Sequence, residues 1–198
     1  MTKVEHHHCF WIGTITLMDK LSVRLANLDD LKYIDSLQIK NSTELSFYPK
    51  DALQREIDLR RIVLAIVNNC HAGYLYFGAI NYNKPVKIHQ ACIEYDLRGN
   101  WYGTALIQYL EKYVFINQAD GISLRCRSNI LANKFWEISG FQCVLVSHGG
   151  KRRNAEINTW YKKINKDLFG LKIFNNFIPS KKEINSSEYF KNYKRQLV

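Results

Sequence analysis

The residues best suited to chemistry lie in one stretch, Ile88 to Leu106, with the sequence IHQACIEYDLRGNWYGTAL. An apolar strand is followed by a turn that contains Arg98, Gly99 and Gly103, and then by the start of an amphipathic helix. Glycines let the backbone approach a ligand closely or adopt a positive φ. Backbone N–H groups in such a turn, together with the positive end of the helix, attract phosphate groups. The stretch therefore predicts a phosphate-binding turn, and the alternative is an ordinary strand-to-helix connection with Arg98 in solvent.

The spacing of apolar residues along the chain predicts the elements that position this turn. Alternating or continuous apolar runs indicate strands, and apolar residues three or four positions apart indicate helices. The predicted strands are residues 21–26, 62–67, 70–80, 86–95, 122–127, 141–146 and 154–164. The predicted helices are residues 29–41, 52–60, 101–117 and 129–138, with Asp51 and Asn129 as caps of the second and fourth. Helices that directly follow strands favour an α/β (α+β) fold, with a mixed sheet of about six to seven strands flanked by about four helices on both faces.

The positive charge of the chain is concentrated in its last quarter. The 198 residues carry a formal net charge of +10, and residues 151–198 contain 12 Lys or Arg and 4 Asp or Glu, a net of +8. We therefore expect an N-terminal arm at residues 1–20, one domain at residues 21–164 and a basic extension at residues 165–198. The extension is either a solvated tail or a contact surface for nucleic acid or another anionic partner.

Several kinds of protein are not expected from this sequence. The sequence has no run of about 18 apolar residues, so no membrane helix is expected. The first 20 residues also lack the pattern of a secretory signal. Five scattered cysteines without a CxxC pair indicate buried reduced thiols and a cytoplasmic location. The adjacent residues His6, His7 and His8 cannot all face one ion, so no metal site is expected.

A second motif lies at residues 129–141, with the spacing N-x-x-A-x-x-L/F-Y/W-x-x-x-G-F/Y. Its members are Asn129, Ala132, Phe135, Trp136, Gly140 and Phe141. The turn of the first stretch follows the spacing Q/R-x-x-G-x-G/A from Arg98 to Gly103, with Trp101 in place of the first glycine. These two motifs, in this order of elements, resemble the GNAT superfamily of acyl-CoA-dependent N-acyltransferases over residues 21–164.

The resemblance implies a co-substrate, acetyl-CoA or another acyl-CoA, and no metal. Its pyrophosphate would lie on the turn formed by Arg98, Gly99, Asn100, Trp101, Tyr102, Gly103 and Thr104. Its pantetheine arm would pair with the backbone of Cys92, Ile93 and Glu94, where two strands of the family splay apart, and Asn129 would contact the arm. The indole of Trp101 would either lean outward over the cofactor or partly close the turn.

In the family, an amine attacks the thioester, so the amine must lose a proton and the leaving thiolate may gain one. Trp136 stands where the family often has a tyrosine acid, and because an indole is no acid at neutral pH, the acid stays unassigned. His89 and Glu94 lie on the strand before the turn and by parity point to opposite faces. Glu94 is nearer the expected thioester and is the candidate base. The alternatives are an ion pair for Glu94 and a structural hydrogen bond for His89.

The resemblance implies an N-acyltransferase, and the sequence does not name its amine acceptor. Specificity in this fold usually comes from the segments at residues 44–50 and 147–153. The second carries three adjacent cations at residues 151–153, which suit an acidic or phosphate-bearing acceptor unless they are a solvated hairpin tip. The basic extension leaves open an enzyme that modifies nucleic acid or tRNA. Trp101 and Trp136 leave open a catalytically weak module that binds CoA or a partner. No membrane partner is expected, and the oligomeric state is not indicated.

Overall fold

The structure, a computed structural model, describes residues 20–149 and 156–164. These residues all belong to one unit within residues 1–164. The histidine tract, the rest of the predicted arm up to residue 19, the cations at residues 151–153 and the basic extension lie outside the described residues.

The described residues form strands, α-helices and two short 3-10 helices. The strands are β1 (Leu21–Leu25), β2 (Ile62–Val67), β3 (Cys70–Phe77), β4 (Pro85–Ile93), β5 (Gly121–Arg127), β6 (Gln142–His148) and β7 (Glu156–Lys163). The helices are η1 (Leu28–Asp30), α1 (Leu31–Lys40), α2 (Lys50–Asp58), η2 (Tyr95–Leu97), α3 (Tyr102–Ile116) and α4 (Ala132–Ile138). The predicted mixed sheet flanked by helices is confirmed, with seven strands.

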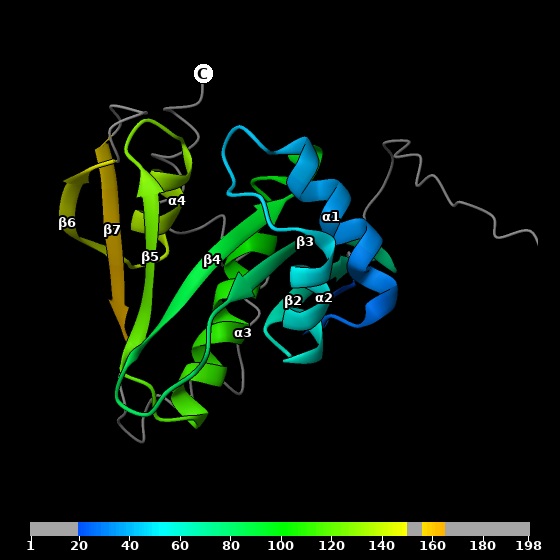
Figure 1. Ribbon diagram of the computed structural model, residues 1–198, viewed down its shortest axis with the longest axis horizontal. Coiled ribbons are helices and arrows are strands. Elements are labelled where there is room, and N and C mark those ends of the chain that lie inside the picture. Colours follow the sequence, from blue (N-terminus) through cyan, green and yellow to red (C-terminus); the bar gives the residue numbers. More distant parts are fainter. Residues whose placement is uncertain (1–19, 150–155, 165–198) are drawn as a thin grey trace, which may run out of the picture. The chain divides into compact units, whose positions relative to one another are not determined.

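The sheet has the strand order β1-β2-β3-β4-β5-β7-β6. Only β4 and β5 run parallel, and every other neighbouring pair is antiparallel. Figure 1 shows β4 and β5 close together at one end and well apart at the other. The sheet is thus joined at its centre by a short parallel contact.

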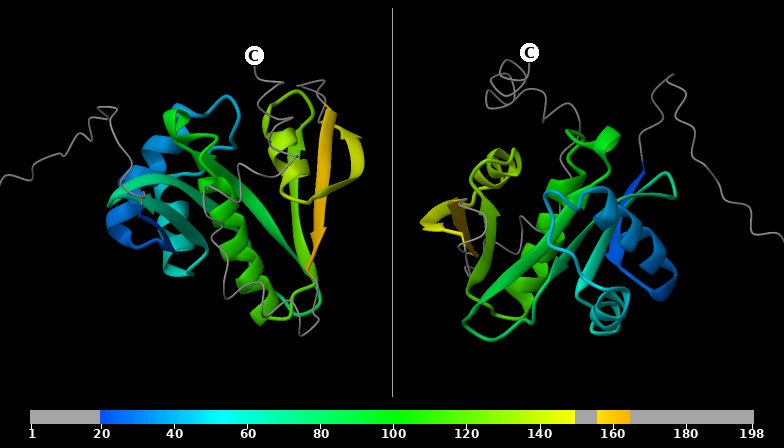
Figure 2. Two further views of the ribbon diagram at one scale, coloured as in Figure 1. Left: turned by 180° about the vertical axis from the view of Figure 1, so that it is seen from behind. Right: turned by 45° about the horizontal axis from the view of Figure 1, so that its top comes forward.

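Each face of the sheet has its own hydrophobic core. On β3, Leu75 and Phe77 lie in the core shared with α3 and α4, whereas Tyr74 and Tyr76 lie in the core shared with α1 and α2. This alternation follows from the two-residue period of a strand. Figures 1 and 2 show α1 and α2 on one side of β2, β3 and β4 and α3 on the other.

Two predicted helix starts are wrong. Helix α2 begins at Lys50 with Pro49 as its N-cap, so Asp51 lies in the first turn, where its charge is favourable at the positive helix end. Helix α4 begins at Ala132 with Leu131 as its N-cap, so Asn129 lies in the preceding turn.

A side chain inside α4 explains its late start. The Asn133 amide donates to the carbonyls of Arg127, Ser128 and Ile130 at 2.6, 3.1 and 2.9 Å. These three bonds hold the residues before α4 in a turn instead of letting the helix extend backward.

The described residues also bear on the expected classes of site. No helix within them is long and apolar enough to cross a bilayer, and no group of three or more potential ligands there is placed to hold a metal ion. Cys92 and Cys126 are buried free thiols, whereas Cys143 is free but exposed. Cys70 is disulfide-bonded, which differs from the expectation of reduced thiols throughout.

Asp30 connects the first strand to the rest of the sheet. Its buried carboxylate accepts two hydrogen bonds from Arg24 of β1, at 2.7 and 2.9 Å. It also accepts from the Asn27 amide at 2.8 Å, and it lies 2.8 Å from Nε2 of His71 on β3. Burial by itself raises the pKa of Asp30, but these hydrogen bonds outweigh it and lower the pKa from 3.8 to about 2.

We expect this carboxylate to stabilise the fold in a pH-dependent way. Because the pKa of Asp30 is lower in the folded than in the unfolded protein, its contribution to the free energy of unfolding is present above pH 4 and is lost as pH falls toward 2. The pKa difference corresponds to about 2 kcal/mol. Asp30→Asn should lower the free energy of unfolding by that amount at pH 7 and flatten its pH dependence between pH 4 and 2. Urea unfolding measures both.

The exposed neighbour Asp29 provides the control, since Asp29→Asn should change the free energy of unfolding little at any pH. Equal losses in the two variants would contradict the assigned role of Asp30.

Candidate functional site

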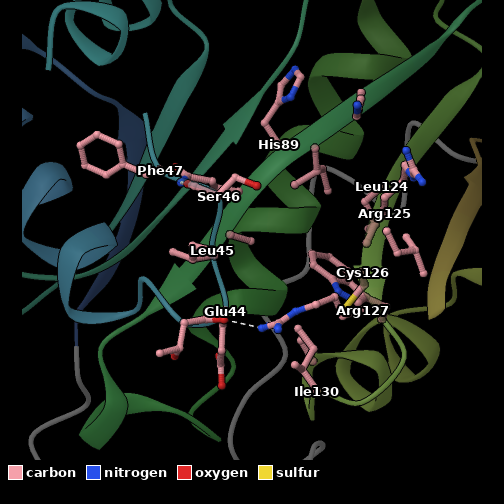
Figure 3. A pocket seen from close by; sticks show the side chains of 18 of the residues that line it. Glu44, Leu45, Ser46, Phe47, His89, Leu124, Arg125, Cys126, Arg127 and Ile130 are labelled. Carbon is pink, nitrogen blue, oxygen red and sulfur yellow. Dashed lines mark hydrogen bonds between the residues drawn. The ribbon is translucent and has the colours of Figure 1, made fainter. Parts of the chain in front are cut away.

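The divergence of β4 and β5 opens a cavity between the two strands. The strands pair only at Pro85–Gly121, Val86–Ile122 and Lys87–Ser123. Beyond these pairs a cavity of about 1120 Å³ opens between them, and Figure 3 shows its walls. Three segments supply most of the lining: residues 42–48 after α1, residues 87–91 of β4 and residues 124–127 of β5.

The free edge of β4 faces this opening. Cys92 pairs with Tyr74 across β3, and the amide of Glu94 donates to the Ala72 carbonyl at 2.9 Å. Because backbone groups alternate in direction along a strand, those of Ala91 and Ile93 point away from β3, toward the diverging β5. Of the three residues predicted to pair with a pantetheine arm, Ile93 is therefore the one whose backbone faces the opening.

A β-bulge interrupts β4 inside the cavity. The register changes from Tyr76–Gln90 to Phe77–Ile88, which leaves His89 as the extra residue. Ile88 consequently packs in the core shared with α3, although its parity with Gln90 would place it on the opposite face.

The bulge overturns the predicted directions of His89 and Glu94. His89 stacks on Tyr76 with ring centroids 4.8 Å apart, and Tyr76 belongs to the core shared with α1 and α2. Glu94 pairs with Lys40 of α1 at 3.6 Å, so both side chains lie on the same face of the sheet. The prediction of opposite faces is wrong because the extra residue inverts parity. His89 lines the cavity, and Glu94 is not among its lining residues.

His89 is held in an aromatic environment at the bulge. Its Nδ1 lies 3.5 Å from the Tyr48 hydroxyl. Burial is the main cause that lowers the pKa of His89 from 6.5, and Lys87 on the same strand adds to it. Glu56 of α2 raises the pKa of His89 and Arg61 lowers it, and the net effect is a lowered pKa. His89 is therefore neutral at neutral pH and able to accept a proton.

The predicted phosphate-binding turn has an unusual backbone. Gly99 and Trp101 both adopt left-handed conformations, with φ of 80° and 69°. Trp101 occupies the first glycine position of the motif, and this positive φ is the physical reason that glycine suits the position. Trp101 is the N-cap of α3 and makes no side-chain cap hydrogen bond. The amides of Gly103 and Thr104 have no hydrogen-bond partner among the described residues, which leaves donors for an anion.

Gly103 also connects the two sequence motifs. A Cβ at this position would lie 3.1 Å from Cζ of Phe135, which belongs to the second motif on α4. Phe135 in turn packs on Trp136, and Trp136 on Phe141, at centroid distances of 5.0 and 5.4 Å. The glycine thus lets the first turn of α3 approach α4 closely.

The guanidinium of Arg98 turns back onto the protein. Its Nε donates to the Ile93 carbonyl at 3.2 Å, and a terminal nitrogen donates to the Asn41 side chain at 2.8 Å. It also lies 5.3 Å from the ring of Tyr95. Arg98 therefore fastens the turn to the end of β4 and to the end of α1.

The other predicted binding residues differ in exposure. Tyr102 and Cys92 are buried in the two hydrophobic cores, so their backbones are the groups available to a ligand. Asn100 is exposed and donates to the Leu97 carbonyl at 3.3 Å. Asn129 is exposed in the turn between β5 and α4.

Two buried glutamines, neither of them predicted as a site residue from the sequence, hold the loop after α1. Gln38 exchanges hydrogen bonds with the backbone of Tyr48, at 2.7 and 3.1 Å. Gln90 of β4 donates to the Ser46 carbonyl and accepts from the Tyr74 hydroxyl. A buried glutamine on the apolar face of a predicted element is the signal that could have revealed them, because buried polar groups require partners.

A third missed residue, Arg127, ties this loop to the other wall of the cavity. It reaches from β5 across the opening and donates to the Thr43 carbonyl, as Figure 3 shows. The loop at residues 41–48 is thus fastened to α1, β4, β5 and the turn before α3.

Trp136, at the motif position where the family often has a tyrosine, lines the cavity. Its side chain is buried in the same hydrophobic core as Cys126 of β5. Burial raises the pKa of Cys126 to about 11, which the contact with Trp136 opposes. The Cys126 thiol is therefore protonated near neutral pH.

A family model described as "Acetyltransferase (GNAT) domain" matches residues 33–157. This range contains the cavity, the turn and the second motif, and it is more than half of the chain. The chain belongs to the GNAT acetyltransferase family. No curated protein sequence matches it.

Solved GNAT structures share the fold of this GNAT chain at low sequence identity. Arabidopsis thaliana NAA60 in complex with a bisubstrate analogue is 18% identical, with a TM-score of 0.64 and coverage of 75% of this chain and 100% of that one. An aminoglycoside 6'-N-acetyltransferase complexed with coenzyme A is 16% identical, with a TM-score of 0.64 and coverage of 73% and 97%. Ard1 from Thermoplasma volcanium is 13% identical, with a TM-score of 0.64 and coverage of 73% and 98%.

The left-handed backbone of Trp101 leads to a stability prediction within this GNAT turn. Trp101→Gly and Trp101→Ala both remove the indole, but only glycine relieves the left-handed penalty of roughly 1–2 kcal/mol. We expect the glycine variant to unfold with a free energy about 1 kcal/mol higher than the alanine variant in urea.

The same pair of substitutions at Lys112, an exposed position inside α3, is the control. There alanine should be the more stable variant, because glycine disfavours a helix interior. If Trp101→Ala has a free energy of unfolding equal to or higher than that of Trp101→Gly, the left-handed backbone does not destabilise the protein as expected.

Proposed function

We propose that this protein is an acetyl-CoA-dependent N-acetyltransferase whose reaction takes place between β4 and β5. The proposal is supported by the divergence of these parallel strands after three residue pairs. The start of α3, with free amides, lies beside the opening. Together they supply a slot with one unpaired strand edge and an anion-binding turn at its end. A long, thin molecule with phosphates at one end fits this combination.

The residues present fit acetyl-CoA in two places. The amides of Gly103 and Thr104, at the positive end of α3, would hold the pyrophosphate, with Gly99 and Trp101 shaping the turn. The backbone groups of Ile93 and of Ala91 would hold the pantetheine arm. Asn129, across the opening on the β5 side, remains a proposed contact to that arm, as do Arg98, Asn100 and Tyr102 through their backbones.

The thioester of acetyl-CoA supplies an activated acetyl group, and the protein must position an amine and take its proton. We assign the proton acceptor to His89 in place of Glu94. His89 lines the cavity at the bulge and is neutral, whereas the Glu94 carboxylate pairs with Lys40 and does not line the cavity. The amine nitrogen bonds to the acetyl carbon, the carbon–sulfur bond breaks, and the amine proton passes to Nδ1 or Nε2 of His89. Coenzyme A leaves as the thiolate, since the indole of Trp136 is no acid.

Release of free thiol from acetyl-CoA in the presence of primary amines tests the function. We expect wild-type activity to fall as pH drops through the pKa of His89, which lies below 6.5, because the protonated ring cannot act as a base. His89→Gln should lower kcat by about 100-fold and remove this acidic limb. Glu94→Gln, the matched control, should retain the limb and most of kcat.

Two results would separate the alternatives. If Glu94→Gln loses activity and His89→Gln retains it, Glu94 and not His89 is the proton acceptor. Tight acetyl-CoA binding without amine-dependent thiol release would instead indicate a CoA-binding module.

A further inference from the structure

The cavity contains two cations that form no ion pair with an acidic side chain of the described residues. Lys87 of β4 and Arg125 of β5 both line it and are both exposed. Within residues 20–149 and 156–164, neither forms a salt bridge, although seven ion pairs are present elsewhere. Lys87 pairs with Ser123, and Arg125 follows Ser123 by two residues, so the two cations lie on the same face of the sheet where the strands begin to diverge.

The charge of the cavity lining is unbalanced. Among the described lining residues, three cations, Lys87, Arg125 and Arg127, face one carboxylate, that of Glu44. Arg127 is already engaged with the Thr43 carbonyl, whereas the other two cations are not engaged by a described carboxylate. Unpaired cations at the wall of a cavity concentrate anionic ligands, and a guanidinium binds carboxylate or phosphate through two parallel hydrogen bonds.

These cations are too far from the turn to serve the cofactor's pyrophosphate. Lys87 and Ile93 are six residues apart on β4, or about 20 Å along an extended strand. The turn before α3 follows the Ile93 end, so Lys87 and Arg125 lie at the opposite end of the opening. His89 lies between them and the turn, two residues beyond Lys87. Figure 3 shows His89 on one wall and Arg125 on the other.

We propose that Lys87 and Arg125 bind an anionic group of the acceptor, so that the acceptor is an amine bearing a carboxylate or a phosphate. This inference rests on the proposed acetyl transfer. With its anion held by Lys87 and Arg125, the acceptor presents its amine toward His89, on the side from which the thioester arrives. Glu44 at the other wall attracts the ammonium form of the same molecule as it enters.

A panel of paired amines measures this preference. We expect 4-aminobutyrate to be acetylated with a lower KM than butylamine, or phosphoethanolamine with a lower KM than ethanolamine; which pair responds distinguishes carboxylate from phosphate. Lys87→Gln and Arg125→Gln should each raise the KM for the anionic acceptor about tenfold. They should leave the KM for acetyl-CoA and for the neutral amine unchanged. Lys112→Gln, on the exposed side of α3, is the matched control.

A second measurement does not depend on catalysis. Titration calorimetry with glutarate, a dicarboxylate without an amine, and with inorganic phosphate should show at least one anion binding to the wild type. The double variant of Lys87→Gln and Arg125→Gln should bind it at least tenfold more weakly. Undiminished binding in the double variant, or acetylation of spermidine in preference to every anionic amine, would overturn the inference while leaving acetyl transfer intact. Anion binding that is lost in the double variant, without acetyl transfer to any amine, would refute the proposed function and keep the anion site.

Discussion

The structure depends on the short parallel contact between β4 and β5. Three residue pairs join the strands at Pro85–Lys87, and beyond them each strand follows a different neighbour, β3 or β7. Gly121 allows this junction, because a side chain there would collide with the Lys162 carbonyl of β7. The result is a sheet whose central edge is open over most of its length. Everything assigned to the site lies on this opening or at one of its ends.

An open strand edge and a loop over it require polar groups that hold them in place. Gln38 and Gln90 are almost fully buried, at 1% and 2% exposure, and both bind the backbone of the loop at residues 41–48. Arg98 and Arg127 bind the same loop from the turn before α3 and from β5. Buried polar groups are costly without partners, so these contacts favour one arrangement of the loop. The walls of the cavity are thereby fixed relative to the bulge that carries His89.

Much of this architecture can be predicted from the sequence, because burial and periodicity are local signals. The continuous apolar run at residues 62–67 and the aromatic strand that follows Asn69 gave strands close to the observed bounds. The turn and the second motif identified the family. The bulge at His89 has no local signal, since it arises from the pairing of β4 with β3. It places His89 on the same face as Glu94, against the predicted opposite faces, and this is why we propose His89 as the base.

Other differences have the same origin in long-range contacts. Trp101 could be recognised as a departure from the motif, but its left-handed backbone is visible only in the structure. The late start of α4 depends on hydrogen bonds made by Asn133. Lys87 and Arg125 are ordinary polar positions of two strands that are far apart in the chain. The parallel register places them on the same face of the sheet, from which both line the cavity.

We propose that the cofactor lies along the free edge of β4, and hydrogen–deuterium exchange of individual amides can detect it there. Addition of acetyl-CoA should slow exchange at the amides of Ala91 and Ile93, on the edge of β4, and at those of Gly103 and Thr104, at the start of α3. Amides of β1, at the edge of the sheet and separated from β4 by β2 and β3, should keep their exchange rates. If saturating acetyl-CoA leaves all four of these amides exchanging at their original rates, the cofactor does not bind along the free edge of β4.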